Sequence, residues 1–215
     1  MGKYIKKFDT HSDYEDFIET EDFIKPNVSY CVNDVEVHYN PVDPYNGHTY
    51  IDLGLPSGTL WATMNVGANS ETDYGNYYMY GMGSKTYNST DTSYDGTENP
   101  LDLSKDTANV VWGGDWHMPT QAQIEELIAN TTYEWATING VNGGKFTATN
   151  GNYVFFPAAG YWNNGSSDVV GSGGWYWSSS PEGGNTAYDL SFGDDGNGVF
   201  GGNREQGYSV RPVVG

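Results

Sequence analysis

Three carboxylates close together near the C-terminus are the first residues whose types and spacing could do chemistry. Asp189 and the pair Asp194-Asp195 lie in a tract of Gly, Asn, Ser and Asp. Several carboxylates together with carbonyl oxygens are the ligands that Ca²⁺ prefers. Acids in such loops are more often solvated surface charges, and the sugar-binding tripeptides Glu-Pro-Asn and Gln-Pro-Asp of calcium-dependent lectins do not occur. We therefore expect no metal and no cofactor at this tract.

The other reactive side chains do not form a recognisable catalytic set. A hydrolase needs a nucleophile with an adjacent base, or two suitably placed carboxylates. Ser178 to Ser180 stand in a tryptophan-rich segment, where they are better suited to bonding backbone groups, and the four histidines show no HExxH spacing. Cys31 is the single cysteine, so no internal disulfide can form. The sequence predicts that the protein is not an enzyme and has no catalytic residues.

Composition indicates a folded and strongly acidic chain. Of its 215 residues, 15% are aromatic and 17% are charged, and the formal net charge is -19. This charge repels nucleic-acid phosphates and anionic membrane surfaces. No apolar run has transmembrane length, and none follows the basic residues after Met1 as it would in a secretory signal. The sequence therefore predicts no nucleic-acid partner, no membrane insertion and no signal peptide.

The C-terminal region consists of two segments rich in large or rigid residues, here called the frame, and a tract of small and polar residues between them. Trp175–Pro181 and Gly207–Val213 are rich in large or rigid residues and are predicted to be buried. Between residues 183 and 203, every residue type is one that adenine substitution in an Asn codon (AAC or AAT) can produce, and Lys, Glu, Gln, Trp and Met are absent. Glu205 and Gln206 depart from this pattern. The composition indicates a variable surface on a fixed frame, although glycine-rich turns alone would also contain these residue types.

The positions of proline and glycine divide the chain. Two prolines and a glycine within residues 41–47 mark a linker, so a boundary is predicted near residue 46. Before it, residues 9–22 predict a short helix and residues 28–39 predict a hairpin. The expected parts are a helix-plus-hairpin appendage over residues 1–46 and a main domain over residues 47–215 with a variable segment at about 183–206.

The main domain is predicted to be α+β. Residues 50–63 indicate a strand, a turn and a second strand, and residues 119–130 predict a helix with Thr120 as its N-cap. Residues 83–105 are polar and are expected to form a long loop. Short apolar runs separated by Gly and Asn turns follow, which is typical of antiparallel strands; they are residues 145–148, 153–157 and 187–192.

Six ordered motifs span the main domain. They are Leu55–Thr63, Asn65–Ala68, Trp112–Thr120, Phe156–Tyr161, Tyr176–Ser179 and Ser209–Val213. Together they resemble the Fibrobacter succinogenes major paralogous domain over about residues 50–213. The resemblance implies a C-type lectin-like fold of the formylglycine-generating-enzyme branch, with a twisted antiparallel core and displayed loops. The thiol chemistry of that branch cannot carry over, because Cys31 lies outside the domain.

The same family contains variable proteins of diversity-generating retroelements, in which adenine-directed mutagenesis rewrites the C-terminal segment of a ligand-binding protein. The resemblance therefore implies a set of displayed, ligand-contacting positions. Strand alternation places Leu190 and Phe192, with Tyr188, on a buried face and Asp189 and Ser191 on the other. The implied ligand-binding residues are Gly183, Gly184, Asn185, Asp189, Ser191, Gly193, Asp194, Asp195, Gly196, Gly198, Gly202 and Asn203.

Tryptophans could also contribute to binding. Trp61, Trp112, Trp116 and Trp177 are expected in the core rather than on a sugar-binding platform. The neighbours of Trp162 and Trp175 are Gly and Asn loops, so these two are expected to be partly exposed beside the variable surface.

The N-terminal segment has its own distinctive residues, namely Phe8, Tyr14, residues 25–31 and residues 37–41. Through them it resembles the N-terminal parts of virion proteins from phages that infect gut Bacteroides. It implies that residues 1–46 dock onto a virion or surface assembly, so that the protein is virion-associated or released by lysis. If a leader has been removed, the bacterial cell surface is the alternative. A homo-oligomer, such as a trimer through the appendage, is compatible with the sequence.

Two functions are consistent with these observations. The first is a hypervariable receptor-binding or adhesin-type protein that recognises a bacterial surface protein or glycan. The alternative is a non-variable structural or adhesive domain of a virion or cell-surface assembly, in which the glycine-rich loops only pack.

Overall fold

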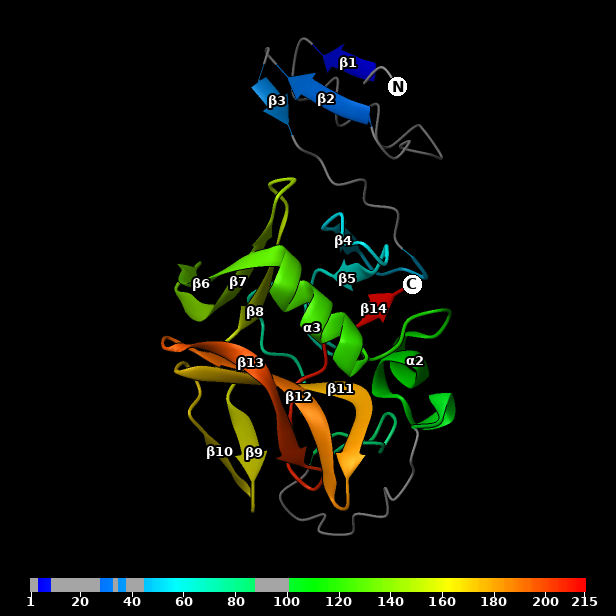
Figure 1. Cartoon of the computed structure of the whole chain (residues 1–215), viewed down its shortest axis with the longest axis vertical. Coiled ribbons are helices and arrows are strands. Elements are labelled where there is room, and N and C mark those ends of the chain that lie inside the picture. Colours follow the sequence, from blue (N-terminus) through cyan, green and yellow to red (C-terminus); the bar gives the residue numbers. More distant parts are fainter. Residues whose placement is uncertain (1–3, 9–27, 33–34, 38–44, 88–100) are drawn as a thin grey trace. The chain divides into compact units, whose positions relative to one another are not determined.

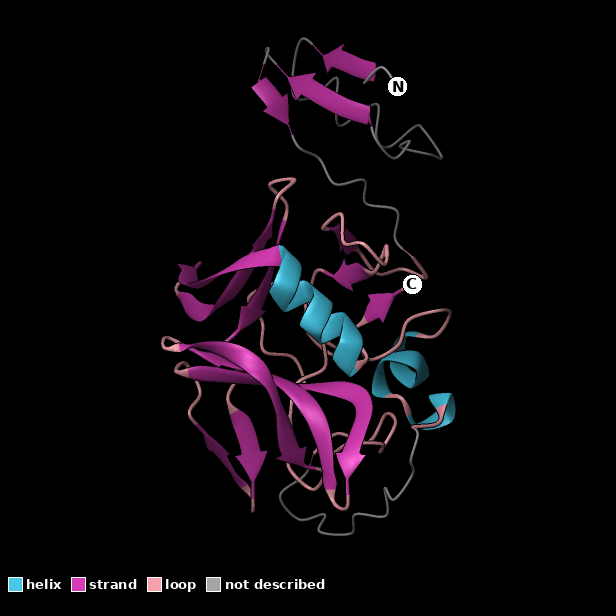
Figure 2. Ribbon diagram, in the orientation of Figure 1, coloured by secondary structure: helices cyan, strands magenta, loops and turns pink. Residues whose placement is uncertain are grey.

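The computed structural model describes residues 4–8, 28–32, 35–37, 45–87 and 101–215. The chain forms two compact units, Met1–Thr49 and Tyr50–Gly215, divided close to the expected boundary. Strand residues far outnumber helical residues in the described part, so the fold is β-rich with few helices (Figure 2).

The first unit contains a small sheet of mixed direction. Strand β2 (Val28–Val32) pairs antiparallel with β3 (Val35–Val37), which confirms the predicted hairpin. Strand β1 (Tyr4–Phe8) pairs in parallel with β2, a pairing that the sequence pattern did not predict. The helix expected over residues 9–22 lies outside the described residues.

The second unit brings its first and last strands together. Strand β4 (Tyr50–Asp52) pairs antiparallel with β5 (Leu60–Ala62), as the strand–turn–strand prediction required. Strand β14 (Val213–Val214) pairs with the other edge of β5, where Val213 lies opposite Trp61. The two ends of this unit are therefore joined by backbone hydrogen bonds (Figure 1).

Helix α3 (Gln121–Asn130) confirms the predicted helix and its cap. The Thr120 side chain accepts a hydrogen bond from the backbone of Gln123, and the Gln123 side chain accepts one from Thr120 N, which completes a capping box. The helix buries Ile124 and Leu127 in the core. Figure 1 shows α3 between two of the sheets.

A second helical segment was not assigned from the sequence. The turn η1 (Leu103–Lys105) lies at the end of the predicted loop, and α2 (Thr107–Trp112) follows it. The Asp106 carboxylate caps α2 by accepting from Asn109 N at 3.0 Å, and it also accepts from Met118 N at 2.9 Å. This buried carboxylate ties the helix to the Trp112–Thr120 motif. Residues 88–100 of the predicted loop lie outside the described part.

Two antiparallel three-stranded sheets and a hairpin form the remainder of the unit. The orders are β6-β7-β8 and β11-β12-β13, and β9 pairs with β10. The predicted strands at residues 145–148, 153–157 and 187–192 are confirmed. The bounds are β6 (Thr131–Ile138), β7 (Val141–Ala148), β8 (Tyr153–Pro157), β9 (Tyr161–Asn163), β10 (Ser166–Asp168), β11 (Gly173–Gly183), β12 (Thr186–Gly193) and β13 (Gly196–Asn203).

Aromatic rings fill the core between α3 and these sheets. Phe156 packs edge-on against Tyr176 at 5.1 Å and against Trp61 at 5.7 Å between ring centroids. Phe192 stacks on Tyr176 at 5.8 Å. Such pairs add about 0.5–1.5 kcal/mol each beyond the area that they bury. The predicted frame is confirmed as core over Gly207–Val213, where every residue is buried, and over Tyr176–Ser178, whereas Trp175 and residues 179–181 are only half-buried.

A buried arginine connects the frame to the rest of the core. Arg211 is 1% exposed, and its guanidinium donates to Asn65 Oδ1 at 2.8 Å, Ala62 O at 3.0 Å and Phe155 O at 2.9 Å. Asn65 in turn donates to the Tyr176 hydroxyl at 3.1 Å. Burial lowers the pKa of Arg211 to about 10, so the group is still cationic at neutral pH.

Replacing this arginine should destabilise the fold severely. We expect Arg211→Leu to lower the free energy of unfolding by roughly 3 kcal/mol, because it leaves three buried acceptors without their donor. Urea denaturation measures the loss. Lys85→Leu, which removes a cation from an exposed position, is the control and should cost less than about 1 kcal/mol.

A double-mutant cycle separates the network from simple loss of packing. Asn65→Ala and Arg211→Leu should be non-additive when combined, because each removes the same hydrogen bond. Additive losses would contradict a coupled network.

Candidate functional site

The variable tract forms two turns at opposite ends of β12. Gly183–Thr186 connects β11 to β12, and Gly193–Gly196 connects β12 to β13. The eight residues of β12 at about 3.3 Å each separate the turns by roughly 25 Å. The predicted ligand-binding residues therefore divide between two places and do not form one patch.

Hydrogen bonds between neighbouring residues hold the first turn. Gly183, Gly184, Asn185 and Asn203 are all exposed there. Asn185 Nδ2 donates to Asn203 Oδ1 at 3.0 Å, and Asn185 O accepts from Arg204 N at 3.1 Å. Gly184 has φ 55°, a conformation that glycine adopts far more easily than most residues. This end presents backbone and amide groups.

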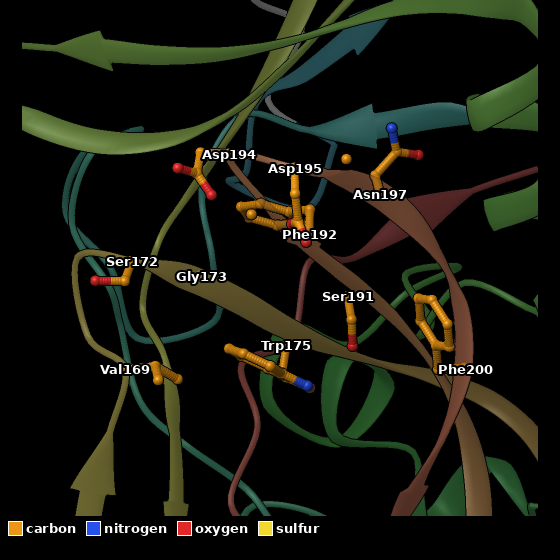
Figure 3. Close-up of a pocket in the computed structure, with 12 residues that line it drawn as sticks. Val169, Ser172, Gly173, Trp175, Ser191, Phe192, Asp194, Asp195, Asn197 and Phe200 are labelled. Carbon is orange, nitrogen blue, oxygen red and sulfur yellow. The ribbon is translucent and has the colours of Figure 1, made fainter.

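The second turn borders an open hollow of ≈ 420 Å³. Ser191, Gly193, Asp194, Asp195 and Gly196 from the predicted set line it together (Figure 3). The turn between β12 and β13 is thus the place where the structure brings five of the twelve predicted residues to one concave surface. The other lining residues are Val169, Ser172, Gly173, Trp175, Phe192, Asn197 and Phe200.

Two aromatic side chains flank the floor of this hollow. Trp175 lies opposite Ser191 in the β11–β12 register, and Ser191 lies opposite Gly198 in the β12–β13 register. The Phe200 ring leans over Gly198, since a Cβ atom placed on Gly198 would lie 2.9 Å from that ring. Figure 3 shows Ser191 between Trp175 and Phe200.

Phe200 is a site residue that the sequence reasoning missed. Its side chain is 57% exposed, which is unusual for phenylalanine. Its exposure follows from the packing of its strand neighbour Val199 against the core, which local sequence patterns do not show. Phenylalanine also fits the adenine-substitution pattern of the tract.

Asp189 is a correction to the predicted displayed set. It does project from the face opposite Leu190 and Phe192, but that face is covered here, and Asp189 is only 1% exposed. Its carboxylate accepts a hydrogen bond from the Ser191 hydroxyl. Asp189 therefore lies beside the floor of the hollow, on the covered part of the same face, and is not itself displayed.

Gly202 is the second correction. It is buried, and a Cβ atom at this position would lie 2.6 Å from the Tyr208 ring and 3.0 Å from Asp189 Oδ2. Tyr208 comes from the frame and stacks on Trp177 with ring centroids 4.0 Å apart. Because Tyr208 covers this part of the sheet, Gly202 belongs to the scaffold.

Burial controls the protonation of this covered region. Desolvation raises the pKa of Asp189 to about 7; the hydrogen bond from Ser191 opposes this shift, and the nearby charge of Glu182 adds to it. Burial and the charge of Asp189 also raise the pKa of Tyr208. Asp189 consequently changes charge near neutral pH directly beside Ser191.

The burial of the tryptophans is as expected, but Trp162 does not lie at the hollow. Trp61, Trp112, Trp116 and Trp177 are buried, and Trp162 and Trp175 are half-buried. Only Trp175 of the latter two lines the hollow. Trp162 instead packs against Tyr77 and Tyr87, with centroid distances of 6.2 and 6.1 Å.

The other residues that could do chemistry have structural partners. Ser178 Oγ donates to Tyr188 O at 2.7 Å, and Ser180 Oγ accepts from Gln121 N at 3.0 Å, so these serines bond backbone groups as predicted. Among the described residues, no group of three or more His, Cys, Asp or Glu side chains could hold a metal ion. Asp189 lies roughly 16 Å along the strand from the exposed Asp194.

None of the helices that the structure describes is both long enough and apolar enough to cross a membrane.

Comparison with known proteins gives one match. A family described as a domain of unknown function (DUF8237) matches residues 134–213. This segment begins within β6 and ends within β14, so it contains both the buried frame and the hollow. No curated protein and no solved structure matches the chain.

Replacing Asp189 should remove a pH dependence of stability. The unfolded chain ionises this group near its ordinary pKa of 3.8 and the folded chain near 7, so its contribution is greatest below about pH 4 and is lost as the pH rises to about 7. We expect Asp189→Asn, which still accepts from Ser191, to raise the melting temperature at pH 8 by roughly 4–8 °C.

Thermal unfolding at pH 4 and pH 8 provides the measurement. The gain should be much smaller at pH 4, where Asp189 is protonated in the wild type. Asp194→Asn removes the same charge from an exposed position and serves as the control. An equal gain at both pH values would contradict the proposed cause.

Substitution by alanine should destabilise the fold at Gly202 but hardly affect it at Asp194. We expect Gly202→Ala to cost about 1–3 kcal/mol, because the new methyl group must displace Tyr208. Asp194→Ala should change the stability by less than about 0.5 kcal/mol, since it is an exposed turn residue. The midpoints of urea denaturation measure both changes in stability. If Gly202→Ala causes no loss of stability, Gly202 belongs to the displayed residues and not to the scaffold.

Proposed function

We propose that this chain is a non-enzymatic, hypervariable ligand-binding protein diversified by a retroelement. The observation that carries the proposal is the correspondence between the adenine-substitution tract and the architecture of one sheet. The tract, residues 183–203, supplies two turns and the strands β12 and β13, and its exposed residues lie in the turns and in β13. The frame on either side of it is buried, at Tyr176–Ser178 and at Gly207–Val213. A changeable surface on a rigid support is the arrangement that adaptable binding proteins use.

The proposed scaffold is C-type lectin-like, of the formylglycine-generating-enzyme branch. Support comes from the antiparallel sheets β6-β7-β8 and β11-β12-β13 and from the pairing of β14 with β5. These features agree with the twisted antiparallel core that the motif resemblance implies. The variable strands β12 and β13 are covered on one face by α3 and the aromatic core.

The proposed setting is a phage particle. In this proposal residues 1–46 dock onto the virion, either singly or as an oligomer such as a trimer, and the second unit recognises a surface protein or glycan of a bacterium. The resemblance of the N-terminal segment to phage virion proteins supports the docking role. The parallel β1–β2 pairing gives that segment an ordered sheet with which to dock.

A non-variable structural or adhesive domain is the competing function. The observation that favours it is that several tract glycines have a local structural reason. Gly184 adopts a positive φ in a turn, and Gly202 makes room for Tyr208. Glycines of this kind need no mutagenesis to explain them.

Sequencing the 3′ end of the gene and its flanking DNA in the source population tests the proposal. We expect a near-copy template repeat, a neighbouring reverse-transcriptase gene, and substitutions confined to template adenines in codons 183–203. Accepted changes should concentrate at exposed positions such as Asn185, Asp194, Asp195 and Phe200. Asp189 and Gly202 should vary little because they are buried. An invariant tract without a template would refute diversification and favour the competing function.

A further inference from the structure

The hollow beside the β12–β13 turn combines exposed acids with exposed aromatic and aliphatic side chains. Asp194 and Asp195 are exposed, and neither pairs with a cation among the described residues. Trp175 is half-buried, and Phe200 and Val169 are 57% and 40% exposed. Exposed Phe and Val side chains around one concavity are typical of an interaction site.

The charges around the hollow have one sign. Its lining contains two carboxylates and no Lys, Arg or His. The field of the pair reaches neighbouring groups, since the charges of Asp195 and Asp194 add to the burial that raises the pKa of Tyr133 to about 12. The whole chain carries 28 acids against 9 basic residues. Such a surface attracts cations and repels anionic ligands.

The aromatic side chains favour the same kind of ligand. A guanidinium or ammonium group is attracted to the face of a Trp or Phe ring, most strongly to Trp. Arginine also stacks its planar group on aromatic rings while its N–H groups bond carboxylates. In Figure 3 the Trp175 and Phe200 rings stand on either side of Ser191, with Asp194 and Asp195 toward the turn.

We propose that this hollow receives an arginine side chain from an exposed segment of a partner protein. The guanidinium lies between Trp175 and Phe200 and donates to the carboxylates of Asp194 and Asp195. Val169 contacts the aliphatic part of the arginine side chain. This inference rests on the proposed function, because it assigns a ligand class to the binding surface named there.

Charge complementarity favours arginine over a sugar. A neutral sugar could stack on Trp175 and bond Ser191, but it gains little from two unpaired carboxylates. Acidic surface glycans would be repelled by the net charge of -19. A cationic side chain uses both the rings and the acids.

Titration of the full chain with small probes tests this proposal. The probes are the peptide acetyl-Gly-Arg-Gly-amide, its neutral isostere with citrulline in place of arginine, and the neutral disaccharide lactose. The reporter is the indole N–H signal of Trp175 in ¹H–¹⁵N NMR spectra, assigned with Trp175→Phe. A single side chain should bind with a dissociation constant in the millimolar range.

The expected result is selective and dependent on charge. Measured through the Trp175 signal, the arginine peptide should bind at least ~5-fold more tightly than the citrulline peptide. Salt at 200 mM should weaken the binding of the arginine peptide several-fold, because exposed pairs are screened. The double variant Asp194→Asn/Asp195→Asn should bind the arginine peptide only as tightly as the wild type binds the citrulline peptide. The control Glu125→Gln/Glu205→Gln removes the same charge elsewhere. Its affinity for the arginine peptide should stay within about twofold of the wild-type affinity.

The other outcomes separate this inference from the proposed function. If lactose or the citrulline peptide binds as well as the arginine peptide, and the Asp194→Asn/Asp195→Asn variant behaves as wild type, the arginine assignment is wrong and the hollow remains a binding site. If no probe moves the Trp175 signal, the hollow is not this site. The sequencing experiment tests diversification independently, so neither of these two outcomes would refute it.

Discussion

The buried guanidinium of Arg211 is the interaction on which the rest of the second unit depends. It joins the C-terminal frame to the β5 end at Ala62, to β8 at Phe155 and, through Asn65, to Tyr176 on β11. No carboxylate contributes to these hydrogen bonds, so the desolvated charge is compensated by carbonyl and amide oxygens and by the Phe156 ring, whose centroid lies 4.9 Å from the guanidinium carbon. That requirement aligns three segments that are far apart in sequence. The sheet that carries the tract is anchored at Tyr176 as a consequence.

The anchored sheet has two faces with different roles. Its inner face supplies Tyr176, Leu190 and Phe192 to the core. Its outer face is divided, because Tyr208 covers the part around Asp189 and Gly202 while the part around Ser191 is open. The hydrogen bond between Ser191 and Asp189 crosses that division. The protonation of a buried carboxyl is therefore linked to a hydroxyl that faces the hollow.

Local patterns predicted strands β2 to β5, β7, β8 and β12 and the α3 cap, but not which outward positions are exposed. Alternation fixes the face on which Asp189 projects, whereas its burial depends on Tyr208, which lies beyond the tract. The same limit explains Phe200, whose exposure follows from how β13 packs. It also explains β1, whose parallel pairing with β2 is non-local. Helix α2 was missed because only six residues form it and Asp106, a residue common in loops, is its cap.

The hollow also shows how a tract rich in small residues can still offer a ligand something to bind. Glycine and aspartate provide few contacts that exclude water, and aromatic anchors usually dominate interface energies. Here Trp175 lies in the frame, outside the tract, and it is held by Tyr161 at a centroid distance of 5.0 Å. A change at Ser191, Asp194 or Asp195 would alter the chemistry beside this ring without moving it. Binding strength would then come from Trp175 and binding specificity from the tract residues beside it. The ligand could therefore change while Arg211 continues to hold the sheet in place.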